Sequence, residues 1–202
     1  MRTGETLVLK PRGVDSLLLP EIYSVMPSVK HMFIYRRNIE KSVIDMLKMF
    51  AVVGGRYVWK LMIWFPALVG RFIGFLEVLE PFIRKYPIRS TADAAFFMYA
   101  LPHREVMRAQ IHDGIEFYRV AYEDLMSNPE TTLRKAFEWF HCDPDDCIKL
   151  ALMAFNRDSQ EGTGLSESAL AKVDVGMKKL SARDRNRCNV MCDVMGIPRF
   201  FE

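Results

Sequence analysis

Two short apolar runs, 7–9 and 31–35, are each followed by a pair of cations. These cations are Lys10 and Arg12 after the first run, and Arg36 and Arg37 after the second. Lysine and arginine bind phosphate groups, and arginine does so through two parallel hydrogen bonds. If the two runs are neighbouring strands of a parallel sheet, all four cations lie at the same edge, where such sheets bind ligands. This arrangement predicts a site for an anionic, phosphorylated ligand, although arginines after a strand also commonly pair with surface carboxylates.

Each apolar run is followed by a segment with helical spacing of its apolar residues, 17–25 after the first and 39–47 after the second. Strand, basic turn and helix in repetition predict a parallel sheet with crossover helices. A further buried strand is predicted at 116–122. We therefore expect a single α/β domain over 1–202, built as a truncated three-layer P-loop-type parallel sheet with flanking helices and a helical insertion at 51–113.

The remaining apolar periodicity predicts mostly helices. They are expected at 90–113, from 129 to 140, from 143 to 155, and from 181 to a stop before Gly196. Ser90 or Thr91 is the expected cap of the first of these, and Pro102 is expected to kink or bound it. His103 and His112, in the same segment, are interpreted as structural rather than catalytic residues.

Composition limits the functional classes. The chain has 202 residues, half of them hydrophobic, and a net charge of only +3, which does not indicate a nucleic-acid partner. No opening stretch resembles a signal peptide, so we expect a cytoplasmic protein. The four cysteines, Cys142, Cys147, Cys188 and Cys192, do not form a metal-binding pattern with histidine, and we expect reduced, partly buried thiols.

Two segments keep alternative interpretations. The apolar segment 51–82 is interrupted by Arg56, Lys60 and Arg71. It is either a helical unit packed on the sheet, a lid over an acceptor pocket, or a surface for peripheral membrane contact. The polar loop 156–166 either clamps a ligand phosphate through groups such as Arg157 and Ser159, or is an exposed turn.

Three stretches in this order resemble the sulfotransferases that use 3'-phosphoadenosine 5'-phosphosulfate. They are Lys10-Pro11-Arg12, then 27–38 ending in Tyr-Arg-Arg-Asn, then 122–129, which reads Tyr-Glu-Asp-Leu-Met-Ser-Asn-Pro. The resemblance runs from about residue 6 to 198. It implies a sulfonate transfer from that donor to a hydroxyl or amine of a small-molecule, glycan or lipid acceptor.

The resemblance also implies roles for particular residues. Arg36 or Arg37 would bind the 3'-phosphate of the donor, and Tyr122 would stack near its adenine. The serine that completes the family's phosphate site falls at Asp45 or Ile44, so Ser42, one turn earlier, is the expected substitute. An aspartate beside a phosphate is repulsive.

The remaining roles concern the reacting groups. Lys10 would stabilise charge on the transferred sulfonate. Arg12 stands where the family has a histidine base, and an arginine binds anions without abstracting protons. The family's 5'-phosphosulfate loop would precede Lys10 and is not found in this sequence. We therefore expect weak or absent turnover, and the alternative is a non-catalytic nucleotide-, partner- or membrane-binding protein of the same fold.

Overall fold

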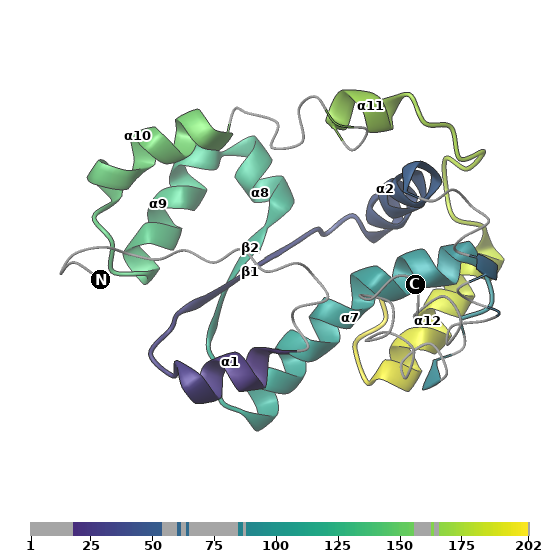
Figure 1. The fold of residues 1–202 in the computed structure, drawn as a ribbon, viewed down its shortest axis with the longest axis horizontal. Helices are drawn as coiled ribbons and strands as arrows, with labels where there is room; N and C mark the ends of the chain where they lie inside the picture. The colour runs from purple at the N-terminus through teal and green to yellow at the C-terminus, as the bar shows by residue number, and fades with distance from the viewer. Residues whose placement is uncertain are drawn as a thin grey trace.

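The computed structural model describes residues 18–53, 60–61, 64, 85–86, 88–155, 163 and 166–201. These residues form a mixed α/β structure that is mostly helical (Figure 1). The order of the elements is α1 (Leu19–Val25), β1 (His31–Tyr35), α2 (Ile39–Val52), α7 (Thr91–His112), β2 (Phe117–Ala121), α8 (Tyr122–Ser127), α9 (Pro129–Trp139), α10 (Pro144–Phe155), α11 (Glu167–Ala171) and α12 (Ala182–Met195).

The two strands pair in parallel, as the order of strand and helix signals predicted. The register places His31 opposite Phe117 and Tyr35 opposite Ala121, so both strands end at the same level. A parallel pair requires a crossover connection, and here the connection carries α2 and α7. Residues 7–9 lie outside the described part of the chain, so their pairing with β1 stays a prediction.

Two groups of helices lie on different sides of the strand pair. Figure 1 shows α8, α9 and α10 on one side and α2, α7 and α12 on the other. The second group contains the main core, in which α7 packs against both α2 and α12. Its most buried side chains include Val43, Phe96, Phe97, Leu101 and Cys192, each at most 2% exposed. Burial of these apolar side chains holds α2, α7 and α12 together.

Helix α7 begins and ends within a residue of the range 90–113 that the sequence predicted. Ser90 and Asp93 form a capping box, in which each side chain accepts the other residue's backbone N–H. Pro102 lies inside the helix, which continues to His112, so of the two predicted alternatives, a kink or a boundary, the boundary is wrong. Buried side chains on both sides of the proline outweigh its local cost. Gly114, with φ of 65°, follows the helix.

The end of β2 also differs from the sequence prediction. The strand was expected to include Tyr122, but it ends at Ala121, and Tyr122 is the first residue of α8. Asn128 stands at the N-cap position of α9, as predicted, although its side chain makes no capping hydrogen bond. The early turn into α8 brings Glu123 and Asp124 back towards the end of β1.

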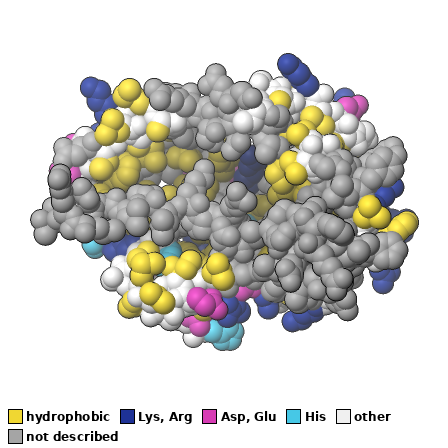
Figure 2. Space-filling view, viewed as in Figure 1, with side chains coloured by type: hydrophobic (Ala, Val, Ile, Leu, Met, Phe, Trp, Pro, Cys, Tyr) yellow, Lys and Arg dark blue, Asp and Glu magenta, His cyan; other side chains and the backbone are white. Residues whose placement is uncertain are grey.

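The exposed side chains and the cysteines do not by themselves indicate a particular ligand. On the face drawn in Figure 2, described Lys and Arg side chains lie mainly around the outline, with hydrophobic side chains nearer the middle. All four cysteines are free, and Cys188 and Cys192 are buried on α12. Burial raises the pKa of the Cys188 thiol to about 12. Within the described ranges, no helix is long and apolar enough to cross a membrane.

Candidate anion site at the carboxyl ends of the strands

The aligned strand ends bring two predicted site residues into contact. Arg36 follows β1 directly and Tyr122 follows β2 directly. The Cζ atom of Arg36 lies 4.7 Å from the centroid of the Tyr122 ring, which is a cation–π contact. From α7, the Tyr99 hydroxyl donates a hydrogen bond of 2.5 Å to the backbone oxygen of Arg36. Burial raises the pKa of Tyr99, so this donor keeps its proton.

The guanidinium of Arg36 pairs with a carboxylate of helix α2. Its Nη1 atom lies 2.6 Å from Oδ2 of Asp45, and the two side chains are 34% and 30% exposed. Lys41 approaches the same oxygen at 3.3 Å. Asp45 is the position where the sulfotransferase resemblance expects a serine. The aspartate therefore takes the place at Arg36 that a bound phosphate would need.

Arg37 is held by two acidic residues of α8. Its guanidinium forms two parallel hydrogen bonds of 2.6 Å with the carboxylate of Asp124. The backbone amides of Arg37 and Asn38 donate to the carboxylate of Glu123 at 3.0 and 3.1 Å. The Asp124 hydrogen bond raises the pKa of Arg37. Partial burial acts to raise the pKa of Glu123, but the backbone hydrogen bonds outweigh it and the net shift is downward.

The Glu123 carboxylate lies at the N-terminus of α2, where a helix stabilises negative charge. The amides of Arg37 and Asn38 immediately precede α2, and Asn38 is its N-cap residue. Free N–H groups at a helix N-terminus, together with the helix dipole, stabilise negative charge. Two guanidinium groups and two backbone amides at this edge are thus all engaged with carboxylate oxygens. The groups assembled here are anion-binding groups.

Ser42, the expected substitute for the family's serine, is directed elsewhere. Its hydroxyl donates to the backbone oxygen of Asn38 at 3.0 Å, and the residue is 7% exposed. This bond to the residue four positions earlier is common for serine inside a helix. Four other predicted site residues, Lys10, Arg12, Arg157 and Ser159, lie outside the described residues, and their roles stay predictions.

His103 lies in an aromatic cluster beneath the same end of the sheet. The ring centroids of Phe33, Tyr99 and Phe200 are 5.0, 4.7 and 5.6 Å from that of His103. Burial, with a smaller effect of the positive charge of Arg119, lowers the pKa of His103 to about 4. A neutral imidazole packed among rings is a structural residue, and here it packs against the ring of Tyr99.

The sequence interpretation missed the acidic half of this site. Asp45 was noted only as unfavourable for phosphate, and Glu123 and Asp124 were assigned to the strand end. The available signal was their position: two acids directly after a strand whose parallel neighbour ends in two arginines. Pairing across that edge follows once the strands are adjacent.

Comparisons with known proteins add no assignment. No protein-family model, no curated protein and no solved structure matches this chain. The described residues form a mixed α/β structure with arginine–carboxylate pairs at the carboxyl ends of two parallel strands.

Proposed function

We propose that this chain is a sulfotransferase-like domain of the three-layer P-loop type, which binds a 3'-phosphorylated adenosine nucleotide at the ends of β1 and β2. The observation that carries the proposal is the convergence of Arg36, Arg37 and Tyr122 at the aligned strand ends. The guanidinium groups would bind the phosphate, and the Tyr122 ring would give the adenine base a surface to stack on.

A phosphate has to replace a carboxylate to bind here, and the two arginines differ in how readily they allow this. Arg37 and Asp124 are 57% and 49% exposed, and exposed ion pairs contribute about 0 to 1 kcal/mol. A phosphate dianion, which forms stronger charge-assisted hydrogen bonds, can replace Asp124 at little cost. The Arg36–Asp45 pair is less exposed, so in this proposal Arg37 is the primary phosphate ligand.

The reaction proposed for the domain is transfer of a sulfonate from 3'-phosphoadenosine 5'-phosphosulfate to an acceptor hydroxyl or amine. The sulfur–oxygen bond to the donor phosphate breaks as the bond to the acceptor oxygen or nitrogen forms, and the acceptor proton passes to a base. Lys10 would stabilise the charge that develops on the donor side. Arg12 remains protonated and would orient an anionic group rather than act as the base.

Calorimetric titration with adenosine 3',5'-bisphosphate tests the nucleotide site. Arg37→Ala is expected to weaken binding at least about tenfold, because it removes a bidentate charge-assisted contact. Arg199→Ala is the matched control, since Arg199 is similarly exposed and forms the same two-bond pair with Asp193. Its affinity should equal that of the parent protein.

A non-catalytic role is the second candidate, and one observation favours it. Both guanidinium groups are already neutralised by carboxylates, so the cluster also serves as a structural connection between β1 and α8. If the parent protein and the Arg36→Ala and Arg37→Ala variants all fail to bind adenosine 3',5'-bisphosphate, the nucleotide proposal is wrong and this second role stands.

A further inference from the structure

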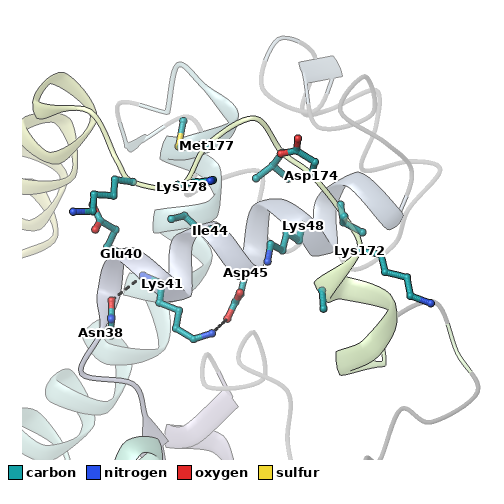
Figure 3. Close-up of a pocket in the computed structure, with 14 residues that line it drawn as sticks. Asn38, Glu40, Lys41, Ile44, Asp45, Lys48, Lys172, Asp174, Met177 and Lys178 are labelled. Carbon is teal, nitrogen blue, oxygen red and sulfur yellow. Dashed lines mark hydrogen bonds and ion pairs between the residues drawn. The ribbon is translucent and has the colours of Figure 1, made fainter.

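A separate groove lies between α2 and the segment 171–179. Its volume is about 490 Å³, within the range of small-molecule sites. Figure 3 shows Lys41, Ile44 and Lys48 on α2, with the segment that carries Lys172 and Lys178 running over the helix. We call this the lysine groove, because its lining includes five lysines: Lys41, Lys48, Lys172, Lys178 and Lys179.

The groove has three carboxylates, and each is already engaged. Glu40 accepts the backbone N–H of Leu180 and pairs with Arg185 at 3.4 Å. Asp45 pairs with Arg36. Asp174, the third, accepts the backbone N–H of Gly176 at 2.7 Å. Glu40 and Asp45 are therefore paired with arginines outside the groove lining, whereas Asp174 accepts a backbone N–H and keeps its negative charge.

The lysines, by contrast, are mostly uncompensated. Lys41 shares Asp45 with Arg36 at 3.3 Å. The side-chain ammonium groups of the other four lysines form no hydrogen bond or ion pair with any residue in the part of the chain that the structure describes. Lys48 is half-buried, which makes its charge more costly to leave without a partner. Several unpaired ammonium groups around one cavity are an electrostatic site for an anion of more than one charge.

The remaining lining residues limit the shape of that anion. Ile44, Val173 and Met177 contribute apolar surface between the cationic groups. Lysine is a flexible point charge without the planar fork of arginine, so it suits phosphate or sulfate groups that project in several directions. Neither Arg37 nor Tyr122 lines the groove, although Asn38 and Asp45 belong both to its lining and to the strand-end site, so the two sites are neighbours.

We propose that the lysine groove binds a compact polyanion, a small molecule that carries several phosphate or sulfate groups on a carbon skeleton, at a site distinct from the strand-end nucleotide site. The ammonium groups contact the anionic groups, and the apolar residues contact the skeleton. The probes are inositol hexakisphosphate, which presents phosphate groups, and sucrose octasulfate, which presents sulfate groups.

The test is calorimetric titration of the full chain with each probe at about 50 and about 200 mM salt. The double variant Lys48→Gln/Lys178→Gln is expected to weaken binding at least about tenfold, as the loss of two close charges requires. Lys135→Gln/Lys149→Gln on α9 and α10 removes the same charge from exposed positions outside the groove. This control should stay within about twofold of the parent.

The outcomes separate the groove from the nucleotide site. Tighter binding of either probe identifies phosphate or sulfate as the preferred group and supports the proposal. Absence of binding by both probes, or equal weakening in the two double variants, overturns it. Adenosine 3',5'-bisphosphate binding should be unchanged in Lys48→Gln/Lys178→Gln, and Arg37→Ala should not alter probe binding. Loss of nucleotide binding in the lysine variant would make the groove part of the nucleotide site and refute the separate site.

Discussion

Removal of the Asp45 carboxylate should increase the affinity of the strand-end site for phosphate. Asp45 holds Arg36 at 2.6 Å and carries its negative charge at the position that a phosphate on Arg36 would share. Two like charges about 4 Å apart repel by about 1 kcal/mol in water and about 4 kcal/mol near a protein surface. Asp45→Asn removes this repulsion, keeps the shape of the side chain and frees a guanidinium group.

The expected gain is about tenfold or more in the affinity for adenosine 3',5'-bisphosphate, since about 1.4 kcal/mol corresponds to one factor of ten. The loss of stability should be small, about 1 kcal/mol, because the pair is partly exposed. Isothermal titration calorimetry gives the affinity, and chemical unfolding gives the stability. Asp193→Asn is the control, since it removes a carboxylate from a surface pair with Arg199.

Nucleotide affinity that is unchanged or reduced in Asp45→Asn would refute the reasoning. It would mean that Asp45 does not compete with the ligand and that Arg36 is a purely structural partner of α2. An equal gain in Asp45→Asn and Asp193→Asn would also refute it, because the effect would then come from net charge rather than from this site.

Two further predictions concern stability. The neutral form of His103 is favoured in the folded protein, where burial lowers its pKa to about 4. The contribution of His103 to the free energy of unfolding is therefore complete above about pH 6.5 and is lost as the pH falls towards 4. The total loss is about 3 kcal/mol. Unfolding at several pH values should show this loss in the parent and in the exposed control His112→Gln, and a clearly smaller loss in His103→Phe, where His31, whose pKa burial also lowers, remains. Asp93→Ala should cost about 3 kcal/mol, because Asp93 is 2% exposed and its loss leaves Arg187 without its partner, whereas Asp193→Ala should cost less than about 1 kcal/mol. A pH profile for His103→Phe like that of the parent, or equal costs for the two aspartates, would contradict these assignments.

Local sequence signals predicted most of the secondary structure. The run 31–35 is β1, the strand predicted at 116–122 contains β2, and Ser90, one of the two predicted caps, accepts the backbone N–H of the third residue of α7. These features depend on neighbouring residues alone: side-chain alternation, helix capping and left-handed glycines. The parallel direction of the strands followed from the long connection between them.

Features that depend on contacts between residues far apart in the sequence were harder to predict. A kink and a boundary were the alternatives at Pro102, and packing on both sides of it keeps the helix continuous to His112. Tyr122 was expected to extend β2, but its contact with Arg36, 86 positions away in the chain, accompanies the turn into α8. Neither the packing around Pro102 nor the Arg36–Tyr122 contact leaves a pattern in the local sequence, because each depends on residues of another segment.

The sequence by itself determined that Arg36 and Arg37 follow a strand, and hence that cations lie at a sheet edge. Only the tertiary structure decided what they face there: Asp45 on the following helix, and Glu123 and Asp124 on α8. The lysine groove is likewise a product of folding, since its two walls are more than 100 positions apart in the chain. The physical reason is that charge interactions act over a few ångströms in space, and a sequence gives the charges but not those distances.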